Sequence, residues 1–325
     1  MLPAISRVLL PVFAAICVLS ASAHAQDWPK KPVRIVSPFA PGGGSDVMAR
    51  VLADSLSQRL HQQFFVENRA GAGGVTASLA VARMDPDGYN FVVSGIATHA
   101  IAPIINPNTG YDPVNDFTHV AYFGGPPIVF IVPTGLGVKS LSDLVNYAKT
   151  RKETLTFASP GTGTSGHLMA EYFAQKSGIK IEHVPYRGAA PGVLDVVAGH
   201  LRFGSMTWTT AAGQIAAGTV VPLAVSSPAR LADFPAIPTF KEAGYPDLVS
   251  TTWFALSGPA GLPKDIVGKI NSEVIKALAK PEVQARLKVE QILTEPMTPE
   301  EFTQFVAAEF ARWRPVAEKI QLKAN

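Results

Sequence analysis

Short apolar segments alternate along the chain with longer segments whose apolar residues recur every three or four positions. The first apolar segment, residues 33–36, is β-branched and predicts a buried strand. Met48, Val51, Leu52 and Leu56 follow at helical spacing and predict an amphipathic helix. Because this alternation continues along the chain, it favours an α/β fold with largely parallel sheets.

The same pattern assigns most of the remaining chain. The segments that predict strands are residues 64–68, 91–94, 155–159, 179–184, 201–206 and 221–225. Residues 120–123 and 128–132 predict extended runs, and residues 252–256 predict a segment that connects two parts of the fold. The segments that predict helices are residues 75–82, 141–150, 167–176, 191–198 and 214–217. Residues 263–323 predict two further amphipathic helices, and the proline-rich residues 234–246 predict a surface excursion.

A glycine-rich loop joins the first predicted strand to its helix. Gly42, Gly43 and Gly44 allow a sharp turn and a close approach of the backbone to a ligand. Ser45 or Asp46 is placed to cap the helix that follows. Free N–H groups and the positive end of the helix dipole then meet at one point, which predicts an anion site. The alternative is a tight turn that holds no ligand.

A second strand, loop and helix repeat this arrangement in residues 155–176. In this loop Gly161, Gly163 and Gly166 match the spacing of a dinucleotide-binding loop, and Glu182 stands further along the chain as the fingerprint requires. The context is poor for a nucleotide, because hydroxyl side chains crowd the loop and the chain carries an export signal. We therefore interpret the loop as a second anion cradle.

The first 25 residues have the pattern of a signal peptide. Arg7 precedes an apolar run, and the small residues Ala23 and Ala25 follow it, so we expect export to the periplasm and cleavage after Ala25. Cys17, the single cysteine of the chain, falls within this segment, so the mature chain has no thiol for a disulfide, a nucleophile or a metal site. The formal net charge is only +3 and no basic run stands out, which argues against a nucleic-acid partner.

Chain length and the order of the elements predict two domains. We expect the chain to cross between them near Gly124 and Pro127, and to return near Ser250 and Phe254. The first domain is then residues 26–124 plus 251–325, and the second is residues 125–250, after the signal peptide at residues 1–25.

Catalytic chemistry has little support in the sequence. A nucleophile elbow needs a glycine where His167 stands, and the histidines show no metal-ligand spacing. Thr98 and His99 lie just past a predicted strand, where ligands of α/β sheets bind; Thr98 is the better candidate, and His99 is expected to cap or pack. We therefore expect no catalytic residues, no metal and no cofactor.

Several motifs, in order along the chain, resemble the Bug (TctC) family of periplasmic solute receptors. They are Trp28-Pro29-x-Lys31-Pro32-Val33-Arg34, the loop SPFAPGGGSD at residues 37–46, Asn68-Arg69-x-Gly71-Ala72-Gly73-Gly74, Ser159-Pro160-Gly161 with Ser165 and His167, Val184-Pro185-Tyr186-Arg187-Gly188, and Glu242-Ala243-Gly244-Tyr245-Pro246. The resemblance implies a periplasmic binding protein fold, with two Rossmann-like domains joined by a hinge. It also implies a small organic carboxylate as ligand and the membrane subunits of a tripartite tricarboxylate transporter as partner.

The resemblance, together with the two loops, predicts the ligand-binding residues. They are Phe39, Pro41, Gly42, Gly43, Gly44, Ser45, Asp46, Thr98, Ser159, Thr162, Thr164, Ser165 and Thr207. We expect a monomer that binds a dicarboxylate. The ligand is expected to be aromatic only if Phe39, Trp208 or Trp253 forms a wall of the cleft instead of packing in the core. Many family members have an aspartate where this chain has Arg202, which matters only if that position faces the cleft. An exported hydrolase or oxidoreductase, and a receptor for a sensor kinase, remain the alternatives.

Overall fold

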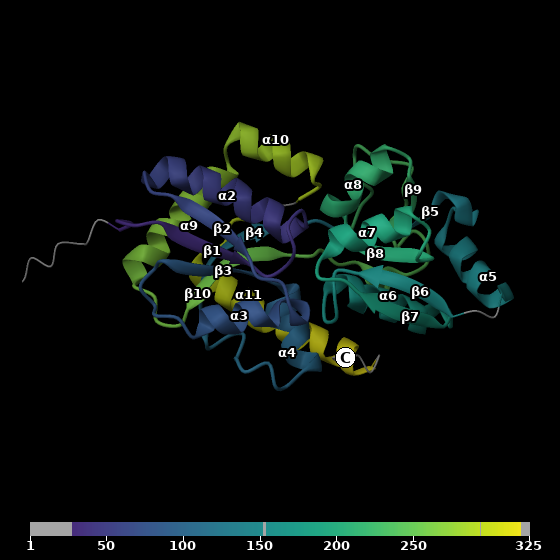
Figure 1. The fold of residues 1–325 in the computed structure, drawn as a ribbon, viewed down its shortest axis with the longest axis horizontal. Coiled ribbons are helices and arrows are strands. Elements are labelled where there is room, and N and C mark those ends of the chain that lie inside the picture. Colours follow the sequence, from purple (N-terminus) through teal and green to yellow (C-terminus); the bar gives the residue numbers. More distant parts are fainter. Residues whose placement is uncertain (1–27, 152–153, 293, 320–325) are drawn as a thin grey trace, which may run out of the picture.

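The computed structural model describes residues 28–151, 154–292 and 294–319. The predicted signal peptide and its cleavage position therefore lie outside the described residues. Within the described part of the chain, two α/β domains lie next to each other along the long axis of the molecule, each with one five-stranded sheet (Figure 1). No helix in that part is long and apolar enough to cross a membrane.

The first domain is built on a sheet with the strand order β2-β1-β3-β10-β4. Its strands are β1 (Val33–Ser37), β2 (Phe64–Asn68), β3 (Asn90–Gly95), β4 (Phe117–Gly124) and β10 (Phe254–Pro259). Its helices are α2 (Gly44–Leu60), η1 (Ala72–Gly74), α3 (Val75–Ala82), η2 (Ala97–Ile101), α4 (Ala102–Ile105), α9 (Lys264–Leu278), α10 (Pro281–Val289) and α11 (Pro299–Lys319). Helices α2, α9 and α10 cover one face of this sheet, and α3 and α11 cover the other.

The second domain is built on a sheet with the strand order β7-β6-β8-β5-β9. Its strands are β5 (Ile128–Pro133), β6 (Leu155–Ser159), β7 (Ile181–Pro185), β8 (Phe203–Thr207) and β9 (Val220–Val225). Its helices are η3 (Thr134–Leu136), α5 (Leu141–Arg151), α6 (Ser165–Ser177), α7 (Ala189–Val197), α8 (Trp208–Ala216) and η4 (Pro246–Leu248). Successive residues of β5 alternate between the face under α5 and α6 and the face under α7 and α8, as the period of a strand requires.

Both sheets are mixed, whereas the sequence predicted largely parallel ones. Strand β10 is antiparallel to β3 and β4, and β5 is antiparallel to β8 and β9. The physical reason is that each of these strands directly follows a crossing between domains. Phe254 opens β10 opposite Gly95 at the end of β3, and Ile128 opens β5 opposite Thr207 at the end of β8. The other strands therefore end at the domain interface, where the two crossing strands begin.

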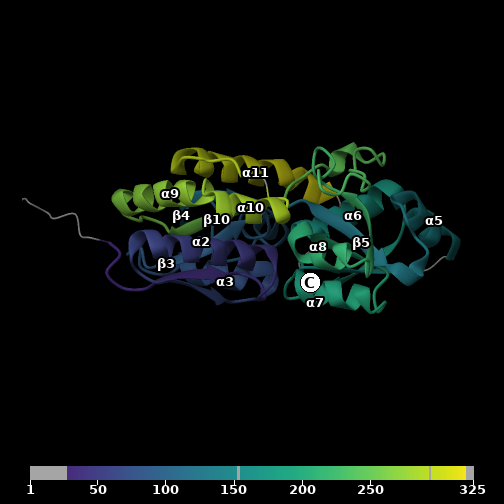
Figure 2. The same cartoon turned by 90° about the horizontal axis from the view of Figure 1, so that it is seen from above.

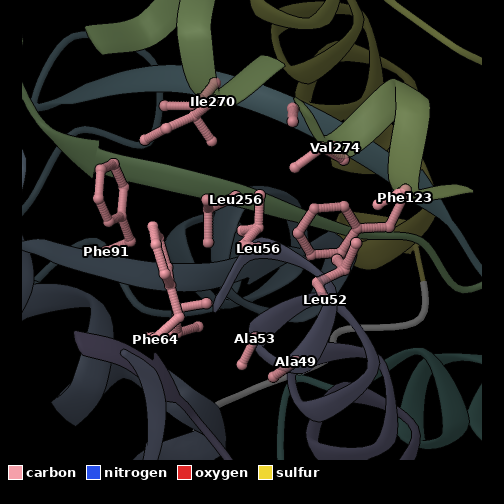
Figure 3. Packing of buried hydrophobic residues seen from close by; sticks show 14 of the residues in the cluster. Ala49, Leu52, Ala53, Leu56, Phe64, Phe91, Phe123, Leu256, Ile270 and Val274 are labelled. Carbon is pink, nitrogen blue, oxygen red and sulfur yellow. The ribbon is translucent and has the colours of Figure 1, made fainter. Parts of the chain in front are cut away.

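The core of the first domain lies between its sheet and α2 and α9. Figure 3 shows Leu52 and Leu56 of α2 pointing toward Phe123 and Leu256 of the sheet, with Ile270 of α9 behind them. All five side chains are buried. Burying an apolar side chain of this size contributes about 1.5–3 kcal/mol, so the helical spacing read from the sequence is what attaches α2 to the sheet.

Phe130 of β5 is the centre of the second core. Its ring centroid lies 5.3 Å from that of Phe173, 5.6 Å from that of Phe203 and 4.8 Å from that of Phe240. Phe240 is fully buried, although it belongs to the proline-rich segment that the sequence predicted to be a surface excursion. That prediction was wrong because the segment follows β9 closely, with the Phe240 N–H donating to the Val225 carbonyl at 2.9 Å.

Two other element predictions also need correction. Helix α8 begins at Trp208, six residues before the predicted start, because Thr207 ends β8 in extended backbone and Trp208 continues directly as helix. In the described residues the C-terminal region holds three helices rather than two. A short break separates α9 from α10, and Pro281 is the first residue of α10. The remaining predicted elements are present, with ends shifted by a few residues.

Two extended segments connect the domains side by side. The Thr252 N–H donates to the Pro126 carbonyl at 3.0 Å, and Pro127 forms an antiparallel bridge with Thr251. Strands β1–β4 and β10 lie on one side of these crossings and β5–β9 on the other (Figure 2). Helix α11 runs alongside, and its Val316 packs against the core of the second domain. The expected domain boundaries stay a prediction.

Candidate ligand-binding site

A cavity lies between the two sheets, where the strands of both domains end. This is the edge of an α/β sheet at which ligands bind. The residues of the first domain that line it include Phe39, Gly43, Gly44, Ser45, Ser94 and Thr98. Those of the second domain include Pro160, Thr164, Ser165, Ala189 and Thr207, and the returning segment adds Thr252 and Phe254.

Helix α2 points its N-terminus at this cavity. Its N-cap is Gly43, which has extended backbone and makes no side-chain capping bond, so the prediction that Ser45 or Asp46 caps the helix was wrong. The Asp46 and Val47 N–H groups both donate to the Gly43 carbonyl at 3.0 Å. The N–H groups of Gly44 and Ser45 precede these donors, at positions that have no intrahelical partner. They are therefore available to an anion in the cavity.

Gly44 must lack a side chain for the cavity to exist in this form. A Cβ atom there would lie 3.0 Å from the Phe254 ring and 3.7 Å from Thr207 Oγ1, both of which line the cavity. A branched side chain at Gly44 would therefore occupy the space between the two domains.

Helix α6 supplies a second N-terminus from the other domain. Thr164 is its N-cap, and the Thr164 side chain accepts from the His167 N–H at 3.4 Å. The first helical residue is Ser165, whose Oγ lies 2.8 Å from Thr252 Oγ1 in the returning segment. Two helix N-termini, one per domain, thus border the same space, as the repeated strand–loop–helix pattern predicted.

None of the described residues that line the cavity has a charged side chain. Its polar groups are backbone N–H groups and hydroxyls, and its apolar wall includes Phe39, Val93, Ile96 and Phe254. Such a lining stabilises an anion by hydrogen bonds and helix dipoles in a space with little water. The arrangement suits a small organic anion that also has an apolar part.

The structure brings together most of the predicted ligand-binding residues. Those that line the cavity are Phe39, Gly43, Gly44, Ser45, Thr98, Thr164, Ser165 and Thr207. Those that do not line it are Pro41, Gly42, Asp46, Ser159 and Thr162. Thr162 lines a neighbouring cavity between the domains. Ligand contact at any of these positions stays a prediction.

Asp46 holds the glycine loop in place by hydrogen bonds. Its carboxylate accepts from the Gly42 N–H at 3.0 Å, from Arg50 Nε at 3.0 Å and from Asn68 Nδ2 at 2.8 Å. Burial alone would raise the pKa of Asp46, but the hydrogen bonds from Arg50, Gly42 and Asn68 outweigh it and hold this pKa below its usual value. Asp46 is therefore an anion with all its partners in the protein, and it positions the loop.

Ser159 and two histidines support the second loop in the same way. Ser159 Oγ lies 2.6 Å from His183 Nε2 and accepts from the Gly161 N–H at 3.1 Å. His167 Nδ1 accepts from the Gly163 N–H at 3.2 Å. Burial lowers the pKa of His167 to about 3 and that of His183 to about 4, so both rings are neutral at neutral pH. Ser159 is fully buried and does not line the cavity.

The domains also touch at the rim of the cavity. The Ala40 N–H donates to the Arg187 carbonyl at 3.0 Å. Gly73, with φ of +64°, lies so close to the opposite loop that a Cβ atom there would be 2.2 Å from the Thr162 carbonyl oxygen. The structure is therefore in a closed arrangement, with one glycine of the first domain against the backbone of the second.

Sequence reasoning left several positions open, and the structure places them. His99 is fully buried, with Nδ1 2.9 Å from Thr98 Oγ1, and it packs as expected. Trp208 and Trp253 are also buried and do not line the cavity. Arg202 is exposed just before β8, at the end opposite to Thr207, so it does not face the cavity.

The residues that the sequence missed come from several parts of the chain, and two of them lie in the returning segment. Thr252 and Phe254 line the cavity, and so do Ser94, Pro160 and Ala189. The domain crossing predicted near Ser250 and Phe254 was the available signal, because a segment that passes between two domains must border the space between them.

Residues 48–322 match the TctC family model, described as the tripartite tricarboxylate transporter family receptor. The chain belongs to this family. BugT of Bordetella pertussis (strain Tohama I) is 33% identical over 316 residues, which cover 97% of each chain. TctC-like proteins of this kind are periplasmic solute-binding proteins, as the resemblance in the motifs implied.

Solved structures of similar proteins share the fold over nearly their whole length. The R. palustris protein Rpa4515, solved with adipate, has a TM-score of 0.88 and 33% identity, covering 91% of this chain and 99% of its own. The periplasmic binding protein BugD has a TM-score of 0.87 and 30% identity, covering 91% and 99%. MatC (Rpa3494) from Rhodopseudomonas palustris, with bound malate, has a TM-score of 0.85 and 30% identity, covering 89% and 99%. The periplasmic binding protein fold predicted from the sequence is confirmed.

The expected lack of a metal and of a nucleotide cofactor stays a prediction, on which two observations bear. No group of three or more His, Cys, Asp or Glu side chains there is arranged to hold a metal ion. The glycines of the dinucleotide-like loop approach protein backbone instead: a Cβ atom on Gly166 would lie 2.3 Å from the Ser205 carbonyl oxygen, and one on Gly163 3.6 Å from the Ala102 Cα. Because these glycines have no side chain, the loop packs closely against the sheet of its own domain at Gly166 and against the other domain at Gly163.

Proposed function

We propose that this protein binds a small organic carboxylate between its two domains and delivers it to the membrane subunits of a tripartite tricarboxylate-type transporter. The observation that carries the proposal is the uncharged cavity bordered by the N-termini of α2 and α6, one from each domain. Each helix N-terminus favours an anion by about 0.5–2 kcal/mol, and exclusion of water strengthens the effect.

The ligand is a dicarboxylate in this proposal. Rpa4515 was solved with adipate and MatC with malate, and both molecules carry two carboxylates. A dicarboxylate that touches a helix N-terminus in each domain stabilises the closed state, because only that state brings both helices to it. The residues we assign to ligand contact are those that line the cavity: Phe39, Gly43, Gly44, Ser45, Thr98, Thr164, Ser165 and Thr207, together with Thr252 and Phe254.

We further propose a periplasmic monomer that binds its ligand without altering it. Export through the signal peptide, with cleavage after Ala25, places the mature chain where a transporter receptor works. Binding without turnover is supported by the position of Ser159 and His183 outside the cavity and by the absence of an acid–base pair among its described lining residues.

A thermal-shift screen of the mature protein with mono-, di- and tricarboxylates tests this function. We expect a dicarboxylate to raise the unfolding temperature, and mass spectrometry to recover that ligand unchanged after long incubation. A screen in which no carboxylate stabilises the protein would contradict the binding proposal, and a chemically altered ligand would contradict binding without turnover.

A further inference from the structure

A second cavity adjoins the first between the same two domains. Phe39 and Pro160 line both cavities, so the two spaces share a wall. The second cavity is otherwise lined by residues 71–74 of the first domain and by residues 161–162 and 185–187 of the second. Residues 71–74 have no side chain larger than a methyl group, so they leave this space open.

Arg187 is the one charged residue among those that line the second cavity. Neither a hydrogen bond nor an ion pair of its guanidinium to another described residue is present. By contrast, Arg50 and Arg69 of the first domain are paired with Asp46 and Glu67. The positive charge of Arg187 therefore has no anion from the described part of the chain.

The backbone that carries Arg187 is firmly placed at the cleft. The Arg187 carbonyl accepts from the Ala40 N–H at 3.0 Å, and the preceding Tyr186 N–H donates to the Ser159 carbonyl at 3.2 Å. The Tyr186 hydroxyl donates to Asp195. The two bonds of Tyr186 lie within the second domain and hold the backbone beside Arg187 there, and the bond from Ala40 joins that backbone to the first domain.

The chemistry of the two cavities differs in a way that matches an extended diacid. The first cavity offers neutral N–H and hydroxyl groups, the shared wall is apolar, and the second cavity has an arginine among its lining residues. A guanidinium forms two parallel hydrogen bonds with a carboxylate. A cation elsewhere on the protein surface would not contact this ligand.

We propose that Arg187 determines specificity by binding the distal carboxylate of an α,ω-dicarboxylate whose other carboxylate lies in the first cavity. The methylene chain then passes along Phe39 and Pro160. This inference rests on the proposed function, since it assigns one end of the carboxylate ligand. A ligand with a single carboxylate makes every contact except the one to Arg187.

The test uses straight-chain diacids of four to eight carbons, each paired with the monocarboxylate of the same length. Calorimetry measures their affinities for wild-type protein, Arg187→Gln and Arg187→Lys, with thermal unfolding as the check of folding. Arg202→Gln is the matched control, because Arg202 is also an exposed arginine of the second domain but lies away from both cavities.

We expect wild-type protein to prefer at least one diacid over its monocarboxylate, and Arg187→Gln to lose at least ten-fold in affinity for that diacid. The same variant should lose less than two-fold for the monocarboxylate, Arg187→Lys should fall between, and Arg202→Gln should match wild type. Equal losses for both ligands, or a preference for diacids that survives in Arg187→Gln, overturn the assignment of Arg187 alone. If wild-type protein binds no carboxylate of the series, the proposed function fails together with it.

Discussion

The imidazole rings of His167 and His183 stack with their centroids 3.8 Å apart and their planes 12° apart. Each ring holds a different part of the second loop, His167 through the Gly163 N–H and His183 through Ser159. Protonating either ring would place a charge against its neighbour in a buried site. The stack therefore supports the loop only while both rings are neutral.

Acid should weaken the protein through these histidines. The pKa values of about 3 and about 4 lie below the ordinary value of 6.5, so the unfolded chain binds more protons than the folded one between about pH 4 and 6.5. The stability is thus fully present above pH 6.5 and falls as the pH decreases through that window. Burial also lowers the pKa values of His99 and His119, so these two histidines act in the same direction. Glu171 is a separate case: it faces His167, and burial raises the pKa of its carboxyl.

The variant His183→Gln isolates one of these protons. Glutamine retains hydrogen-bonding groups but does not titrate, so the slope of unfolding free energy against pH should decrease by up to about 1.4 kcal/mol per pH unit between pH 4.5 and 6. Urea unfolding at four pH values in this range measures the slope. An unchanged slope would mean that His183 does not titrate on unfolding.

Gly44→Val should abolish most ligand binding, whereas Gly43→Ala should weaken it little. A Cβ on Gly44 meets Phe254 at 3.0 Å, but one on Gly43 meets nothing closer than the Ala40 carbonyl oxygen at 3.7 Å. The valine methyls fill the space between the domains, so we expect a loss of at least ten-fold in affinity for the diacid selected in the thermal-shift screen. Calorimetry on both variants, after circular dichroism confirms folding, decides the matter; equal affinities would show that the N-terminus of α2 does not approach the ligand.

Gly73→Ala should hold the domains apart. Its methyl group would overlap the Thr162 carbonyl of the other domain, so closure becomes unfavourable without any change in the first cavity. Gly137→Ala is the matched control, because Gly137 also has a left-handed φ, +76°, but a Cβ there has no neighbour within 4 Å. Both variants bear a backbone strain of about 1–2 kcal/mol.

Small-angle scattering with and without ligand distinguishes the two variants. Wild type and Gly137→Ala should show a smaller radius of gyration when ligand is bound, and Gly73→Ala should show little change and weaker binding. If Gly73→Ala contracts like wild type, the contact between Gly73 and Thr162 is not required for closure.

Glu309 of α11 should be important for stability near the domain crossing. Its buried carboxylate accepts from the indole N–H of Trp253 at 3.1 Å and from that of Trp313 at 3.0 Å. Glu309→Ala leaves both buried donors without an acceptor and should cost about 2–4 kcal/mol of unfolding free energy. Glu309→Gln retains an acceptor oxygen and should cost less than half as much in the same urea titration. Equal losses would show that the negative charge of Glu309, which also pairs with Arg312, rather than an acceptor oxygen alone determines its effect.

Local patterns in the sequence predicted the elements well where a segment had one clear period. Helix α3 has the predicted bounds, and the predicted helix at residues 141–150 is present as α5, where Ser140 Oγ accepts from the Asp143 N–H at 3.0 Å. The antiparallel direction of β5 and β10 was not predictable in this way, because strand direction depends on where the chain enters the sheet. Phe240 escaped prediction for a related reason, since its burial comes from Phe130 in a distant strand.

The candidate site was predictable in its two glycine loops and less so in its walls. A strand, a loop and a helix N-terminus form a local unit, which placed Gly43, Gly44 and Ser165 correctly at the cavity. Phe254 has no such local signal, because it reaches the cavity through tertiary structure.

The position of β10 between β3 and β4 has a consequence for the order of folding. All strands of the second sheet come from one continuous stretch, β5 to β9, whereas β4 gains its hydrogen-bonded neighbour only when β10 arrives more than 120 residues later. Contacts between distant segments form slowly, because a long loop must close first. As the chain emerges from the export machinery, we expect the inserted half to reach its native state first, and the half that contains the N-terminus to be completed last.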